Sequence, residues 1–196
     1  MNHMELGGKF FIDKKTRIDT SLFQDTVKNR YTFTENYPNA TWVSYGQYTM
    51  QGVELSAQRE IIPELTIFGG WTYLNNNSVT NLPYVPQNAF NAAITGYLGK
   101  FRLSVDAQYQ TSFYSQSLSR NTGSTNTTLV NGFTVANARV SYPIPELGKK
   151  GEVFVMVENL FNQTYSYRQG YPMPGTWGSV AVTETCFPFT STVKVM

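Results

Sequence analysis

The feature that most limits the fold of this sequence is an alternation of apolar and polar residues with a period of two. Its longest run lies between Phe101 and Phe113. The apolar positions there are Phe101, Leu103, Val105, Ala107, Tyr109 and Phe113, and between them stand Arg102, Ser104, Asp106, Gln108, Gln110 and Ser112. A β-strand turns successive side chains to opposite faces, so the run predicts a strand with one apolar and one polar face. Similar runs begin at Leu65, Phe90 and Ala136.

The connections between such runs are of two kinds, which alternate along the chain. Short ones occupy residues 13–16, 60–64, 99–100 and 143–151, and long ones rich in Asn, Thr, Ser, Tyr and Pro occupy residues 34–41, 75–88, 114–131 and 159–175. Because successive antiparallel strands connect at opposite ends, all short turns fall at one rim and all long loops at the other. The sequence predicts an all-β fold, an antiparallel up-and-down meander of about nine strands at residues 4–12, 17–33, 42–59, 65–74, 89–98, 101–113, 132–142, 152–158 and 176–186.

Composition and strand length favour the wall of a barrel. Only 14% of the residues are charged and 15% are aromatic, whereas an ordinary soluble domain is about 25% charged. Two predicted strands, residues 17–33 and 42–59, exceed the usual length of about 3–10 residues in globular proteins. Aromatic residues gather where strands meet long loops, as in the interfacial girdle of a membrane barrel. They are Tyr31, Phe33, Trp42, Tyr45, Trp71, Tyr73, Phe113 and Tyr114. We therefore expect the wall of a large transmembrane β-barrel.

The charged and nucleophilic residues offer little for nucleic-acid binding or catalysis. The 15 basic and 13 acidic residues are spread along the chain and give a net charge of +2, so no basic patch predicts a nucleic-acid partner. The single histidine, His3, is expected at an irregular terminus. The single cysteine, Cys186, has no partner for a disulfide or a metal site. Asp106, Glu54 and Glu158 alternate with apolar neighbours and are expected to face a lumen. We expect no enzymatic activity, no metal site and no cofactor.

The segment from Val153 to Gly175 combines several motifs in order. It reads VFVMVENLFNQTYSYRQGYPMPG, and its motif residues are Asn159, Leu160, Phe161, Asn162, Tyr165, Gly170, Tyr171, Pro172, Pro174 and Gly175. This combination resembles the C-terminal region of TonB-dependent outer-membrane receptors. Upstream, residues 50–55 (MQGVEL) are similar to that family's Gly-Val/Ile-Glu strand motif, and residues 84–86 resemble its proline-containing approach to the next strand. The resemblance extends over nearly the whole chain up to Thr176.

The resemblance implies that residues 1–187 are the C-terminal portion of a receptor β-barrel, and that residues 188–196 are a divergent C-terminal tail. It implies a place in the bacterial outer membrane, in contact with its lipid. The implied function is import of a ferric siderophore or a similar scarce nutrient with TonB-coupled energy. In this family TonB acts through a plug domain, which we expect to be missing here. About nine strands are fewer than half of the about 22 in such transporters, so the resemblance implies a partial wall of a large transmembrane β-barrel.

The long loops are the expected place for ligand binding, because surface loops on a rigid wall commonly carry recognition. Ferric siderophores are commonly anionic or aromatic, so cationic and aromatic loop residues are candidates by charge and stacking. They are Tyr84, Tyr114, Arg120, Arg168 and Tyr171. Two alternatives stay open. One is a passive porin-like or structural barrel wall, which the period of two equally permits. The other is a soluble carbohydrate-binding β-sandwich, whose strands should be shorter and outer faces more charged.

Overall fold

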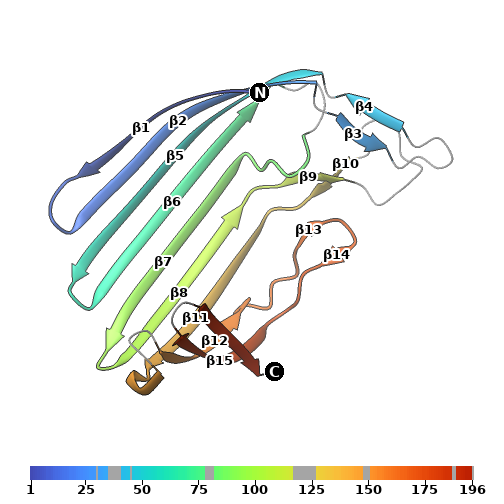
Figure 1. The fold of residues 1–196 in the computed structure, drawn as a ribbon. Coiled ribbons are helices and arrows are strands. Elements are labelled where there is room, and N and C mark those ends of the chain that lie inside the picture. Colours follow the sequence, from blue (N-terminus) through green and yellow to red (C-terminus); the bar gives the residue numbers. More distant parts are fainter. Residues whose placement is uncertain are drawn as a thin grey trace.

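The chain forms one large antiparallel sheet with three short hairpins beyond it (Figure 1). The computed structural model describes residues 1–29, 31–34, 41–44, 46–77, 82–116, 127–147, 151–186 and 189–195. The sheet contains, in spatial order, β1 (Asn2–Phe11), β2 (Thr16–Lys28), β5 (Gln47–Ile62), β6 (Leu65–Asn76), β7 (Asn88–Leu98), β8 (Phe101–Gln110), β11 (Phe133–Pro143), β12 (Glu152–Glu158), β15 (Trp177–Cys186) and β16 (Phe189–Val195). The hairpins pair β3 (Tyr31–Thr34) with β4 (Thr41–Ser44), β9 (Phe113–Gln116) with β10 (Thr127–Val130), and β13 (Ser166–Arg168) with β14 (Tyr171–Pro172). A 3-10 turn, η1 (Pro145–Leu147), precedes β12.

This topology confirms the predicted up-and-down meander. Strands of the main sheet follow one another in space in the order in which they follow one another along the chain. Nine of the ten correspond to predicted strands, and β16 adds a tenth within the residues expected to form a tail. Among the described residues the ten strands make one continuous sheet rather than two packed sheets, which does not support the β-sandwich alternative. No helix in the described part of the chain has the length and apolar character needed to cross a bilayer.

Two predicted strands are each divided where the sheet meets the first long loop. Residues 17–33 separate into β2 and β3, and residues 42–59 into β4 and β5. The breaks fall at Asn29 and Gly46, whose φ angles are 56° and 68°. The Asn29 N–H donates to the Gly46 carbonyl at 2.9 Å. Left-handed backbone at two facing positions ends the regular pleat, so β3 and β4 form a ribbon of their own. Tyr45 lies outside the described residues.

Cross-strand register separates the side chains into an apolar and a polar face. In β8, Val105 lies between Ile94 of β7 and Ala138 of β11, and it is 47% exposed. On the opposite face, Asn137 Nδ2 donates to Asp106 Oδ2 at 2.8 Å. The large apolar residues that share the exposed face with Val105 are Phe101, Leu103 and Tyr109. This alternation confirms the register predicted for residues 101–110. Phe113, expected on the same apolar face, lies instead in β9 and is buried against Val130 and Phe133, because the regular strand ends at Gln110. A broad exposed apolar face is typical of a surface that contacts lipid.

An aromatic row crosses the apolar face near the long-loop end. Trp71 of β6 pairs with Phe90 of β7, and Phe90 pairs with Tyr109 of β8. The ring centroids are 6.3 Å and 5.9 Å apart. Trp71 Nε1 donates to Asn88 Oδ1 at 3.1 Å, so the indole lies beside apolar rings and still satisfies its polar atom. The row lies where an interfacial girdle is expected.

The polar face, called the inner face below, is partly covered by segments from the long-loop end. Leu82, between β6 and β7, packs with Tyr48 of β5 and Val27 of β2. Leu82 and Tyr48 are both buried. Farther along the sheet, Gln108 Nε2 donates to the Tyr167 hydroxyl of β13 at 3.1 Å. Among the described residues, loop segments thus fold back over the polar side of the wall, whereas the apolar side stays exposed.

Candidate functional site

The β13–β14 hairpin is held on the inner face by an aromatic cluster. Tyr165 lies with its ring centroid 4.6 Å from that of Phe133, and Tyr167 meets Phe133 edge-on at 5.2 Å. Phe133 is buried, and Gln108 holds the Tyr167 hydroxyl from the sheet. Burial raises the pKa of Tyr165 above its ordinary value, with smaller contributions from Tyr167 and Glu158. The cluster gives this part of the rim a fixed, largely apolar base.

Asn159 fixes the loop that carries this hairpin. It is 2% exposed and has a φ of 54°. Its Oδ1 accepts the Gln163 N–H at 2.8 Å, and its Nδ2 donates to the carbonyls of Gln163 and Pro174 at 2.9 Å and 3.1 Å. Its N–H donates to Asn137 Oδ1 at 3.1 Å, and its carbonyl accepts the Thr176 hydroxyl at 2.6 Å. One residue therefore joins both ends of the loop to the sheet.

Four of the five predicted ligand-binding residues lie in described loops, and Arg120 lies outside the described residues. The Tyr84 N–H donates to the Tyr114 carbonyl at 2.6 Å, which places these two residues together. The Arg168 guanidinium carbon lies 5.2 Å from the centroid of the Tyr171 ring, a cation–π arrangement. Tyr171 is 55% exposed, so this pair is open to a ligand that arrives from the loop side.

Ser115 connects the two pairs. It follows Tyr114 in β9 and is fully buried. Its Oγ accepts the N–H of Gln169, the neighbour of Arg168, at 3.3 Å. This bond spans 54 positions of sequence, and it joins the β9–β10 hairpin to the β13–β14 hairpin. The structure thus brings Tyr84, Tyr114, Arg168 and Tyr171 to one connected part of the rim.

A concavity of about 460 Å³ lies between these hairpins. Its lining includes Phe133, Gln163, Tyr165, Gln169 and Pro172, and none of the five predicted residues is part of it. The spacing of Tyr165 and Tyr167 would place both rings on one side of an extended segment, which is a signal for the cluster in the sequence. No local pattern signals Phe133 or Gln169, because each acquires its neighbours from distant strands. Rings and carboxamides in one hollow can stack on a planar ligand and form hydrogen bonds with it.

The carboxylates of the inner face lie where the alternation predicts them. Register places Glu54, Asp106 and Glu158 on the same side as the covered residues of the sheet. His3, expected at an irregular terminus, lies instead in β1, and its Nδ1 is 2.8 Å from Asp25 Oδ1. The prediction was wrong because pairing of β1 with β2 sets these two residues opposite each other. Among the described side chains, no group of three or more His, Cys, Asp or Glu could hold a metal ion.

Comparison with known proteins identifies a matching family and several similar proteins. The family model described as TonB dependent receptor-like, beta-barrel matches residues 2–160. Among curated proteins, the catecholate siderophore receptor Fiu of Escherichia coli strain K12 is 25% identical over 188 residues. The match covers 84% of this chain and 22% of that receptor, so the chain spans less than a quarter of its length.

Solved structures show the same fold. The ferric-catecholate import receptor Fiu from E. coli K12, in its open form, has a TM-score of 0.63 and 23% identity over 92% of this chain and 25% of its own. The copper transporter OprC has a TM-score of 0.69 and 15% identity, over 91% of this chain and 30% of its own. The unliganded ferric citrate transporter FecA has a TM-score of 0.67 and 19% identity, over 98% of this chain and 31% of its own.

Proposed function

This chain belongs to the TonB-dependent receptor β-barrel family, and we propose that it forms part of a receptor that imports a ferric siderophore with TonB-coupled energy. The family consists of transport receptors of the outer membrane, not of enzymes, and the ten-stranded sheet is a partial wall of such a barrel. One observation carries the proposal. The Arg168–Tyr171 pair and the aromatic hollow lie at the loop rim of a sheet whose opposite face is apolar and exposed.

The chemistry of the rim favours a catecholate siderophore over citrate. A ferric catecholate complex combines flat aromatic rings with negative charge, and the rim offers aromatic faces beside one guanidinium. The curated relative is named a catecholate siderophore receptor, which also favours this class of ligand.

The proposed sequence of events begins outside the cell. The exposed Tyr171 ring and the Arg168 guanidinium meet the anionic complex first, because they lie at the surface of the β13–β14 hairpin. The polar inner face then lines the route inward. TonB supplies energy through a plug domain in this family, so the energised step belongs to a part of the receptor outside these residues.

Uptake of iron-55 by cells tests the proposal. Cells in which the gene is disrupted are compared with complemented cells, under iron limitation, with iron-55 presented either as its catecholate complex or as its citrate complex. We expect the disruption to abolish energy-dependent uptake of the catecholate complex and to leave citrate uptake unchanged. A protonophore should stop the uptake in complemented cells. Uptake that persists with the protonophore would support the passive porin-like wall instead, and equal catecholate uptake with and without the gene would contradict the proposal.

A further inference from the structure

The outward face of the first four sheet strands changes from apolar to amide-rich toward the long-loop end. One cross-strand row contains Leu6, Leu22, Val53 and Tyr73, and the next row toward the loops contains Met4, Gln24, Gln51 and Asn75. These residues alternate with inner-face residues such as Phe23 and Gly52, so they point away from the covered side. Such a change across the boundary between the rows is typical of the place where the wall of a membrane barrel leaves the hydrocarbon layer.

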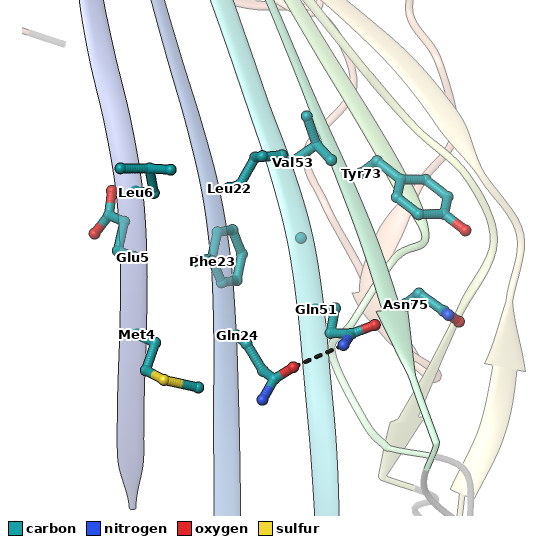
Figure 2. Close-up of a pocket in the computed structure, with 11 residues that line it drawn as sticks. Met4, Glu5, Leu6, Leu22, Phe23, Gln24, Gln51, Val53, Tyr73 and Asn75 are labelled. Carbon is teal, nitrogen blue, oxygen red and sulfur yellow. Dashed lines mark hydrogen bonds between the residues drawn. The ribbon is translucent and has the colours of Figure 1, made fainter.

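A hollow of about 520 Å³ lies on this boundary. Figure 2 shows Leu22 and Val53 on neighbouring strands, with Gln24 and Gln51 beyond them toward the end where β1 begins. Gln51 Nε2 donates to Gln24 Oε1 at 2.7 Å. This bond uses one donor hydrogen of one amide and one lone pair of the other, so both amides keep free donors and acceptors. Apolar side chains thus line one part of the hollow, and carboxamides with unused hydrogen-bond donors and acceptors line the other.

We propose that this hollow binds the saccharide headgroup of an outer-leaflet glycolipid, with the acyl chains along Leu6, Leu22 and Val53. The inference rests on the proposed function, because it requires this face to lie in the outer membrane with the long loops outside. Acyl chains alone do not fit, since they would leave the Asn75 amide and the remaining donors and acceptors of Gln24 and Gln51 unsatisfied. Sugar hydroxyls both donate and accept, as carboxamides do.

The lining of the hollow contains no cationic side chain, and its one charged residue is the carboxylate Glu5, which favours a sugar over a phosphate. Met4, Gln24, Gln51 and Asn75 are neutral, whereas phosphate sites are typically built from Arg or Lys. The first cationic side chain on this face of β2 is Lys28, four residues beyond Gln24, roughly 13 Å away at the rise of a strand. Tyr73 stands in the apolar row below, where an amphipathic ring suits the membrane interface.

Photo-crosslinking in living cells tests this inference. A photoreactive phenylalanine replaces Gln51 at the hollow, Leu103 on the same face near a short turn, or Ser56 on the inner face. After irradiation, adducts of the purified protein are probed for lipid A and for phospholipid. We expect lipopolysaccharide on the Gln51 variant, phospholipid on the Leu103 variant, and neither on the Ser56 variant.

A second measurement uses substitutions that keep side-chain size. Lipopolysaccharide that co-purifies with the detergent-extracted protein should fall about five-fold or more in Q24L/Q51L, because apolar groups replace two hydrogen-bonding amides, and it should be unchanged in L103M. If the Leu103 variant crosslinks to lipid while the Gln51 variant crosslinks only to phospholipid or protein, the proposed glycolipid site is wrong and the proposed function stands. If the Leu103 variant crosslinks to no lipid, this face is not in a membrane and both proposals fail.

Discussion

The ring of Phe23 lies across Gly52 on the neighbouring strand, in space that a Cβ atom on Gly52 would occupy. The contact is on the inner face, where Phe23 also stacks near His3 at a centroid distance of 6.3 Å. Glycine in a strand often marks the close approach of another group. The Gly-Val-Glu motif at residues 52–54 therefore has a local packing reason for its first residue: only glycine lets the ring lie flat on the sheet.

Replacing Gly52 with alanine should destabilise the wall. The new methyl would overlap the Phe23 ring and force it off the strand, a change that costs about 1–3 kcal/mol in a packed site. Gly69→Ala is the matched control, because a Cβ there meets no atom within 4 Å, and it should be neutral or stabilise by up to about 1 kcal/mol. The measurement is the free energy of unfolding in detergent micelles, by urea and tryptophan fluorescence. Equal effects of the two substitutions would contradict the packing role.

Removing the Asn159 side chain should loosen the loop that carries the β13–β14 hairpin. Asn159→Ala leaves the Pro174 and Gln163 groups without their side-chain partner, and each buried group left unsatisfied costs about 1–3 kcal/mol. Asn131→Ala, at an exposed position, is the control. Protease sensitivity between β12 and β15 should rise in the first variant and stay unchanged in the second. An unchanged cleavage pattern for Asn159→Ala would show that the loop is held by other contacts.

The meander could be predicted from the sequence because the alternation and the two classes of connection are local signals. Val105 and Asp106 take opposite faces simply because they are adjacent in a strand. The break at Asn29 was not predictable in the same way, since its left-handed backbone is paired with Gly46 on the other side of a long loop. In the candidate site, too, the features with a local signal were predictable and those that depend on distant segments were not. Tyr171 was identifiable by type and loop position, whereas the bond from Gln169 to Ser115 joins segments 54 residues apart and has no local pattern.

The first short turn should lose stability in acid through Asp13. The Lys15 N–H donates to Asp13 Oδ1 at 2.7 Å, and this bond is the main reason that the pKa of Asp13 lies below its ordinary value of 3.8. A carboxyl whose pKa is lowered by folding stabilises the fold above its ordinary pKa, and this contribution is lost as the pH falls through the lowered value. Amide exchange at Lys15 should therefore accelerate below about pH 3.8. In Asp13→Asn it should be independent of pH there, after correction for the intrinsic rate, and an acceleration that persists in this variant would exclude Asp13 as its source.

Thiol labelling should show that the long loops face outward. Outer-membrane barrels keep short turns inside and long loops outside. With Cys186 replaced by serine, a cysteine at Asn131, in the exposed break between β10 and β11, should react with a membrane-impermeant maleimide on whole cells. A cysteine at Lys100, in the turn between β7 and β8, should react only after permeabilisation. The reverse pattern would invert the orientation, and equal labelling of both positions in intact cells would argue against a spanning wall.

Substitution at Arg168 should weaken ligand capture without affecting assembly. The guanidinium lies 5.2 Å from the Tyr171 ring centroid in an open hairpin, where an anionic aromatic complex can contact both groups. Cation–π contacts contribute about 0.5–2 kcal/mol, so Arg168→Ala should raise the apparent KM of catecholate uptake about 2- to 30-fold. Tyr171→Phe keeps the ring face and should be near wild type, whereas Tyr171→Ala should resemble Arg168→Ala. Lys100→Ala removes one positive charge at the opposite rim, and it should leave KM unchanged. If Lys100→Ala and Arg168→Ala raise KM equally, general electrostatic attraction rather than this pair captures the ligand.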